Sequence, residues 1–329
     1  MIEIKNGNVL DELKKLESES VDSVITSPPY YGLRSYVGSE TIWGGVNECN
    51  HVWERVEVRF GKDHQGYNEK RSYRKFNNGG GIGKNRMRKG VDNFQKFDDP
   101  ESYQCSCGAW KGQLGLEPNH DMYIEHLMLI SDEIMRVLKP TGTVFWNMGD
   151  TYSGSGGAGG DYNKGGLREG QPRYRQGFSD IKKKSLMMIP ERFAIKMIEH
   201  GWILRNKIVW YKRNALPTSI KDRVSVKWEN VFFFVKSGRY FFNKNGLRGD
   251  VWDIPNKQHR FAHFAVFPES LIKQIMEIGS YEGSTVLDPF AGSGTTGVVA
   301  KKNNRNAILI EIVPEYVEIM KNRISEVLG

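Results

Sequence analysis

The sequence predicts an α/β fold with a mostly parallel sheet, because short apolar strands alternate with helices along most of its 329 residues. Residues 1–30 read as strand, helix and strand, ending in an apolar run at 21–25. Near the other end, 284–288 and 306–311 read as strands, and each is followed by a helix. We therefore expect a doubly wound sheet with helices on both faces.

The middle of the chain continues this alternation. Met122, Ile124 and Leu127 begin an apolar series at helical spacing. The predicted elements are a helix over 121–138 that is ended by 140–142, a strand over 143–147, a helix over 186–199, strands over 202–211 and 229–236, and a helix over 267–278.

Segments without apolar periodicity divide the chain. We expect 1–44 and 113–329 to form one catalytic domain and 45–112 to be a basic insert. Gly-rich or basic, turn-rich segments at 151–184 and 212–262 are expected to carry target-recognition loops.

Charge and hydropathy limit the function classes. The formal net charge of +8 favours a polyanionic partner such as DNA, although such a charge also serves solubility alone. No apolar run reaches the roughly 18–20 residues that span a bilayer. The N-terminus has no signal-peptide pattern, so we expect a cytoplasmic protein without a membrane partner.

A glycine-rich turn follows the strand 284–288. Glycines let a backbone approach a ligand closely, and the crevice beyond the strand ends of an open α/β sheet is the usual binding place. The turn also matches the dinucleotide pattern G-x-G-x-x-G, with Glu311 at the distance of a ribose-binding acid, so a nicotinamide or flavin oxidoreductase is an alternative. However, Asp288 would repel a pyrophosphate there. An anion at this place suits a cationic nucleoside such as S-adenosylmethionine.

A second turn, Ser27-Pro28-Pro29-Tyr30, ends the strand 21–25. An exocyclic amino nitrogen is a poor nucleophile because its lone pair is delocalised into the ring. A carbonyl oxygen held by prolines can accept one amino hydrogen, and the Pro28 carbonyl is our candidate. The Ser27 hydroxyl can bond the ring edge, and Tyr30 offers a face on which a flipped base can stack.

Together the two turns resemble the catalytic and cofactor motifs of the amino-directed DNA methyltransferases, and their order resembles the β subgroup of that family. The resemblance implies the S-adenosylmethionine-dependent methyltransferase fold, base flipping and direct in-line transfer without a covalent enzyme intermediate. Asn8 stands where the family usually has an acid. The implied catalytic residues are Ser27, Pro28, Pro29 and Tyr30, and the implied cofactor-binding residues are Asp288, Pro289, Phe290, Gly292, Ser293, Gly294, Thr295, Thr296, Glu311, Asn8, Phe264 and Ala265.

A serine at the first position of the catalytic motif resembles cytosine-N4 enzymes, so we expect N4-cytosine methylation, with N6-adenine methylation as the alternative. The resemblance also implies a restriction-modification system and a cognate restriction endonuclease. An RNA or small-molecule methyltransferase and a non-catalytic DNA-binding protein are more distant alternatives. C5-cytosine methylation is excluded, because it needs a thiol nucleophile, usually in a Pro-Cys pair, and the chain has no such pair.

The three cysteines lie on the two sides of the basic insert. An odd count without a signal peptide argues against a disulfide framework. Cys49, His51, Cys105 and Cys107 have the ligand types of a closed structural zinc site, although their one-residue spacings are tighter than usual. The alternative is three free thiols and a surface histidine.

Basic residues interleaved with aromatic ones are expected to contact DNA in the insert and in the 151–184 loop. A solvated charged face is the alternative. The candidates are Lys75, Arg86, Arg88, Arg173 and Arg175.

Overall fold

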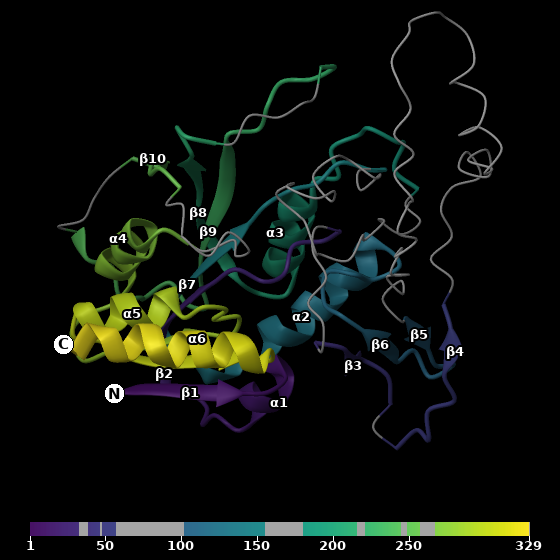
Figure 1. Ribbon diagram of the computed structural model, residues 1–329, viewed down its shortest axis with the longest axis horizontal. Coiled ribbons are helices and arrows are strands. Elements are labelled where there is room, and N and C mark those ends of the chain that lie inside the picture. The colour runs from purple at the N-terminus through teal and green to yellow at the C-terminus, as the bar shows by residue number, and fades with distance from the viewer. Residues whose placement is uncertain are drawn as a thin grey trace, which may run out of the picture.

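A large eight-stranded sheet organises the computed structural model, which describes residues 1–32, 39–46, 48–56, 102–154, 180–215, 221–244, 249–256 and 267–328. Its strands are β1 (Ile2–Asn6), β2 (Val21–Thr26), β7 (Leu138–Met148), β8 (Ile203–Tyr211), β9 (Trp228–Val235), β10 (Val251–Asp253), β11 (Thr285–Asp288) and β12 (Asn306–Glu311). Their order across the sheet is β1-β12-β11-β2-β7-β9-β8-β10 (Figure 1). Only β9 runs antiparallel to its neighbours, so the mostly parallel sheet is confirmed.

Helices cover both faces of this sheet, as expected for a doubly wound fold. One core cluster holds residues of α1 (Val9–Lys14), α2 (His120–Val137) and α3 (Ile189–Glu199). The other holds residues of α4 (Glu269–Gly279), α5 (Thr295–Lys302) and α6 (Pro314–Ser325), which lie together at the lower left of Figure 1. Val24 belongs to the first cluster and its neighbour Ile25 to the second, because successive side chains of a strand point to opposite faces.

The junction of α2 and β7 differs from the prediction. We expected residues 140–142 to separate the helix from a short strand, but β7 begins at Leu138, directly after α2. The pairing of β7 with β2 shifts register between Val21 and Ser23, because Val21 pairs with Leu138 whereas Ser23 pairs with Thr143. Pro140 lies in this irregular stretch, where a strand tolerates a residue that cannot donate a hydrogen bond.

A smaller antiparallel sheet precedes α2. It consists of β3 (Thr41–Trp43), β4 (Glu54–Arg55), β5 (Tyr103–Gln104) and β6 (Trp110–Gly112), in the order β3-β6-β5-β4. Figure 1 shows this sheet at the right, beyond α2. Strands of two or three residues carry no readable periodicity, so the sequence analysis did not predict them. The division into catalytic domain and insert stays a prediction, although β3 begins before residue 45.

A buried histidine attaches the small sheet to α2. The His126 ring stacks between Trp43 and Trp110, with centroid distances of 5.3 and 5.4 Å. Its Nδ1 lies 2.9 Å from Glu117 Oε1, and both side chains are buried. Burial raises the pKa of Glu117, and the hydrogen bond with His126 opposes this shift. The small sheet is therefore fixed to α2. This helix also contacts residues 27–30, which are named the catalytic turn after their predicted role.

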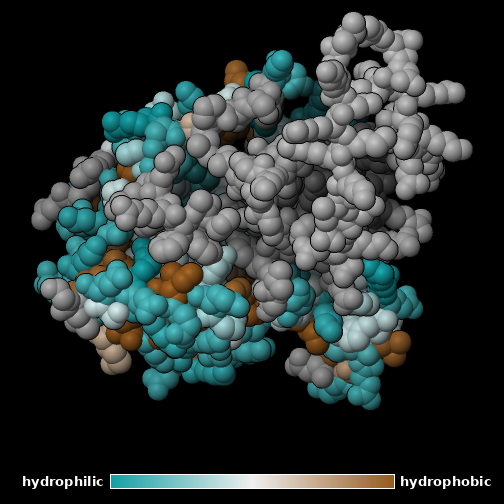
Figure 2. Space-filling model, viewed as in Figure 1, coloured by the Kyte–Doolittle hydropathy of each residue, from teal (hydrophilic) through white to brown (hydrophobic). Residues whose placement is uncertain are grey.

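The outer surface is mainly polar. Figure 2 shows hydrophilic residues over most of the described surface on this face, with hydrophobic residues in small separate groups. Within the described residues, no helix combines the length and the apolar character needed to cross a bilayer.

Candidate functional site

The two turns singled out in the sequence lie side by side at the carboxyl edge of the sheet. Their strands, β2 and β11, are parallel neighbours. The hydroxyl of Thr26, the residue before Ser27, donates a hydrogen bond of 3.0 Å to Asp288 Oδ1, and both side chains are buried. A buried bond to a carboxylate is a strong local restraint, so the two turns hold a fixed relative position.

Asp288 is held by three protein donors. Its Oδ1 accepts from Thr26 and from the Phe290 N–H, and its Oδ2 accepts from the Thr296 hydroxyl at 2.6 Å. Burial raises the pKa of Asp288 to about 6, and the three hydrogen bonds oppose that rise. A carboxylate has about four acceptor positions, so within the described residues Oδ2 keeps one position for a further donor.

Glu311 ends β12, the neighbour of β11. Its Oε2 accepts from the Gly292 N–H at 2.8 Å and its Oε1 from the Val313 N–H at 2.9 Å. The Ile312 N–H adds a smaller stabilising interaction, and among the described residues the carboxylate still keeps acceptor positions on its two oxygens. This pair of acceptors suits two neighbouring hydroxyls, as on a ribose. Burial raises the pKa of Glu311, and backbone N–H groups oppose the rise.

The glycines of residues 288–297, named the cofactor turn after its predicted role, differ in what they allow. Gly292 has a φ of +52°, and a Cβ placed on it would meet nothing within 4 Å among the described residues, so its surface is open to a ligand. A Cβ on Gly294 would lie 2.3 Å from Met320 Cγ, and one on Gly297 would lie 2.4 Å from Leu309 Cδ1. Gly294 and Gly297 therefore allow α5 to pack closely on α6 and β12.

Several predicted cofactor residues support the turn. Arg323 Nη1 donates to the Ser293 carbonyl and hydroxyl and to the Thr295 hydroxyl. Asn8 caps α1, because its Oδ1 accepts from the N–H groups of Leu10 and Asp11, and its Nδ2 donates to Thr41. Pro289 and Thr296 are buried and Phe290 is half-buried. We interpret Ser293, Thr295, Thr296 and Asn8 as groups that set the conformation of the turn and of the nearby chain.

The backbone of the catalytic turn is fixed by α2 and by the segment after β6. Tyr123 donates its hydroxyl to the Pro29 carbonyl at 2.8 Å, and the Gly32 N–H donates to the Gly115 carbonyl at 2.8 Å. Pro28 is buried, and its carbonyl has no protein donor among the described residues, whereas the Pro29 carbonyl is occupied by Tyr123.

Tyr30 is anchored at its hydroxyl. This oxygen lies 2.8 Å from Asn147 Oδ1 and 2.9 Å from Glu229 Oε2, and the Ser27 hydroxyl adds a further hydrogen bond. Burial, followed by the charge of Glu229, raises the pKa of Tyr30, so the phenol stays protonated. Gly149 lies against the ring, because a Cβ there would be 2.5 Å from Tyr30 Cε2. The ring is therefore held in one orientation.

The residues that hold this turn were not predicted from the sequence: Tyr123, Asn147, Glu229 and the close-packed Gly115 and Gly149. A lone carboxylate in the apolar run of β9 was the readable signal for Glu229. Other predicted residues lie outside the described part of the chain. These are Phe264, Ala265, Lys75, Arg86, Arg88, Arg173 and Arg175.

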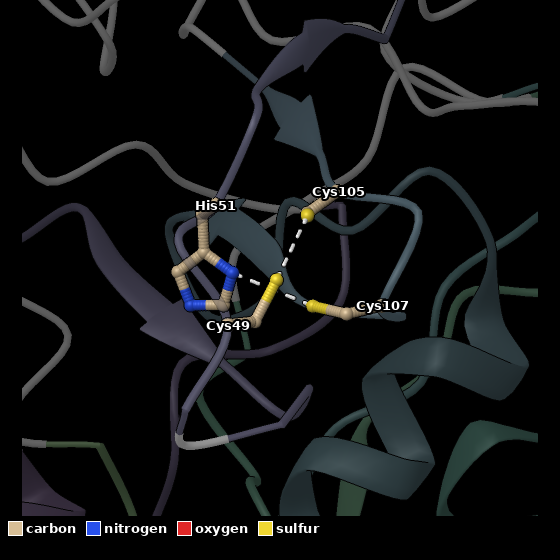
Figure 3. Close-up of side chains that lie close together, drawn as sticks. All are labelled: Cys49, His51, Cys105 and Cys107. Carbon is tan, nitrogen blue, oxygen red and sulfur yellow. Dashed lines mark hydrogen bonds between the residues drawn. The ribbon is translucent and has the colours of Figure 1, made fainter.

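A second group of side chains converges away from this crevice. The Cys/His cluster comprises Cys49, His51, Cys105 and Cys107. Its four ligand atoms lie within 4.8 Å of one another, and Figure 3 shows them pointing toward a common centre. The structure thus brings together residues that are more than 50 positions apart.

Comparison with known proteins assigns the class. The sequence matches the DNA methylase family of N6 and N4 methyltransferases over residues 21–322. The Type II methyltransferase M.Cfr9I of Citrobacter freundii is 31% identical over 333 residues, covering 97% of this chain and 86% of the relative. M.XycI of Xanthomonas campestris pv. cyanopsidis is 32% identical over 331 residues with the same coverage. The chain therefore belongs to the DNA methylase family.

Solved structures agree on the fold. The PvuII DNA methyltransferase (cytosine-N4-specific) matches with a TM-score of 0.59 at 17% identity, over 98% of this chain and 90% of that chain. TTHA0409 of Thermus thermophilus, complexed with S-adenosyl-L-methionine, matches with a TM-score of 0.56 at 17% identity, over 100% and 95%. The family assignment removes the oxidoreductase that the glycine pattern left open.

Proposed function

We propose that this DNA methylase transfers a methyl group from S-adenosylmethionine to the N4 amino group of cytosine at a specific DNA sequence. The hydrogen bond between Thr26 and Asp288 carries the proposal, because it joins the catalytic turn to the cofactor turn at one edge of the sheet. The residues of the crevice fit the cofactor. Among the described residues, nothing lies within 4 Å of a Cβ placed on Gly292, Glu311 keeps an acceptor on each oxygen for the ribose, and Asp288 keeps one for the ammonium.

The bound cofactor would supply a methyl group on a sulfonium, an electrophile that needs no metal. The residues of the chain position the cofactor and the base. Asp288 and Glu311 would hold the cofactor at the ends of β11 and β12. A cofactor fixed in this way keeps its methyl group in line with the attacking nitrogen. Both acids favour a ligand that brings hydrogen-bond donors and positive charge, and such a ligand lowers the pKa that burial has raised.

The catalytic turn would act on the target base. A flipped cytosine stacks on Tyr30, whose ring orientation is set by Asn147 and Glu229. The Pro28 carbonyl accepts one amino hydrogen, so the nitrogen lone pair turns out of the ring plane toward the methyl group. The same carbonyl dipole stabilises the positive charge that develops on the nitrogen as the N–C bond forms and the C–S bond of the sulfonium breaks. Neutral S-adenosylhomocysteine would leave, and the methylated nitrogen would lose one proton to solvent. The Ser27 hydroxyl, which hydrogen-bonds Tyr30, would also bond the ring edge.

Ser27 at the first position of the motif favours cytosine over adenine, and N6-adenine methylation is the second candidate. The PvuII enzyme, titled cytosine-N4-specific, supports the same choice, although the likeness of fold alone does not decide the base. Because M.Cfr9I and M.XycI are named Type II methyltransferases, we also propose a cognate restriction endonuclease as partner in the cell.

Nucleoside analysis of methylated DNA tests the proposal. DNA incubated with the protein and S-adenosylmethionine is digested to nucleosides and analysed by mass spectrometry. We expect N4-methylcytosine, and strongly reduced product with Ser27→Ala and with Asp288→Ala. N6-methyladenine would select the second candidate, and absence of any methylated base from the folded wild type would reject the function. Methylation-sensitive sequencing of a host that expresses the protein then gives the recognition sequence.

A further inference from the structure

We propose that the Cys/His cluster binds one Zn²⁺ in a closed tetrahedral site that clamps two loops of the small sheet, the β3–β4 connection and the β5–β6 hairpin loop. Cys49 and His51 lie in the loop between β3 and β4, and Cys105 and Cys107 lie in the loop between β5 and β6. The site is separate from the crevice, and the proposal does not rest on the methylation chemistry.

Two of the six distances between ligand atoms match the edges of a zinc tetrahedron, and all six are within 4.8 Å. Zn–S bonds of about 2.3 Å and Zn–N bonds of about 2.0–2.1 Å at tetrahedral angles give edges of about 3.8 Å between sulfurs and about 3.5 Å between sulfur and nitrogen. The Cys49 and Cys105 sulfurs are 3.8 Å apart, and Cys107 Sγ lies 3.4 Å from His51 Nδ1. These two pairs share no atom, so they form opposite edges of one tetrahedron (Figure 3).

The same distances exclude a disulfide in this conformation, because a bonded sulfur pair is only about 2.05 Å apart. All three cysteines are free. Three thiolates and one imidazole in a tetrahedron suit zinc, since soft sulfur ligands disfavour magnesium and calcium and zinc accepts this geometry without strain. Four protein ligands leave no open position for a substrate, so the metal would be structural.

The backbone around the cluster is built for two ligand-bearing turns. Gly108 has a φ of +91° and donates its N–H to the Cys105 carbonyl, while the Cys105 N–H donates to the Ala109 carbonyl. Such a tight turn presents both cysteines of one loop to the same side. Gly45 packs on this turn, because a Cβ there would lie 2.5 Å from Ala109 Cβ. The two loops are therefore in contact beside the cluster.

A bound metal would explain how so small a sheet stays folded. It would also stabilise the chain segment that contacts the catalytic turn. β4 and β5 have two residues each, too few for stable pairing without other support. From β6 the chain runs to Gly115, whose carbonyl accepts the Gly32 N–H. A Cβ on Gly115 would lie 3.1 Å from the Tyr30 carbonyl oxygen, so this segment rests directly on the catalytic turn.

Metal analysis of the tag-free full chain, purified under reducing conditions with zinc supplied, tests the proposal. We expect about one zinc per chain by plasma mass spectrometry. His51→Gln and Cys105→Ser should lose zinc affinity by more than about 100-fold, since even changes next to a metal ligand cost about 10–100-fold. The matched control His200→Gln changes a histidine whose recorded partner is Asp132, and should keep its zinc.

Two further readouts cover variants that fail to fold. Replacement of zinc by Co²⁺ in the wild type should give the intense visible absorption of a tetrahedral thiolate complex, and chelation should abolish it and lower the melting temperature. Wild type with three titratable thiols and no stoichiometric zinc would overturn the proposal. So would a Cys49–Cys105 disulfide, a different metal bound one to one, or zinc retained by both ligand variants.

Discussion

Thr26→Val tests the bond that joins the two turns. Valine keeps the shape of threonine but removes the hydroxyl that donates to Asp288 Oδ1 at 3.0 Å. A hydrogen bond to a charged group contributes about 1.5–3 kcal/mol, which corresponds to about 1–2 pKa units at about 1.36 kcal/mol each. Because the lost donor stabilised the ionised carboxylate, the pKa of Asp288 should rise from about 6 toward roughly 7–8.

The expected effect on the cofactor follows from this shift. At pH 7 the ionised fraction of Asp288 falls from about nine-tenths to roughly one-tenth to one-half, so the affinity for S-adenosylmethionine should fall about 2–10-fold. Titration calorimetry from pH 5 to 8 measures the affinity, and the pH at which binding is half lost should move upward by about 1–2 units.

Thr143→Val is the matched control. Thr143 is also buried and loses bonds to Ser23 and to the Gly279 carbonyl, neither of which contacts Asp288. It should lower the free energy of unfolding and leave the pH profile of cofactor binding unchanged. If folded Thr26→Val binds the cofactor with the wild-type pH profile, the proposed coupling through Asp288 is wrong.

Four further predictions concern the same two turns. Burial raises the pKa of Asp288 from 3.8 to about 6, so the folded wild type should lose cofactor affinity up to tenfold per unit as the pH falls below about 6, whereas Asp288→Asn should show weak binding without this pH dependence. Because the folded pKa of Asp288 is raised, its protonation stabilises the folded state fully below pH 3.8, and this stabilisation is lost as the pH rises through about 6. The free energy of unfolding should therefore fall between these pH values in the wild type and not in Asp288→Asn. Gly149→Ala places a Cβ 2.5 Å from Tyr30 Cε2 and should lower kcat by about 100-fold with little change in cofactor affinity. The control Gly238→Ala, whose Cβ would meet nothing within 4 Å among the described residues, should leave methyl transfer unchanged. Equal activity of both variants would contradict the role of the Tyr30 ring. Glu311→Gln removes one acceptor and leaves one backbone N–H unpaired, so calorimetry should show about 10–100-fold weaker cofactor binding with DNA affinity retained, and an unchanged Kd would argue against ribose binding at this residue.

The parts of the fold that depend on local pattern were predictable from the sequence. The strand over 306–311 and the helix beginning at Pro314 match the structure, and the strand before Asp288 differs by one residue. Each has an apolar run or a helix start that is visible in a short window. The adjacency of β2 and β11 was expected only from the family resemblance, because no local signal orders the strands in a sheet.

The support of the catalytic turn was not predictable in the same way. Tyr30 meets Asn147 and Glu229 across 117 and 199 positions, so each contact depends on strand order. The roles of Asp288 and Asn8 also depend on the residues that hydrogen-bond to them. The sequence showed that an acid stands at the end of this strand. Its three hydrogen-bond donors, which affect the pKa of Asp288, come from the folded structure and could not be predicted. Asn8 is a helix cap, which its position before an apolar series also allowed.

A crystal structure of the full chain with S-adenosylhomocysteine tests the crevice most directly. The account predicts both ribose hydroxyls within hydrogen-bonding distance of the Glu311 carboxylate, the ligand amino group at Asp288, and the sulfur directed toward the Pro28 carbonyl. Adenosine bound away from the ends of β11 and β12, or sulfur directed away from the catalytic turn, would contradict it.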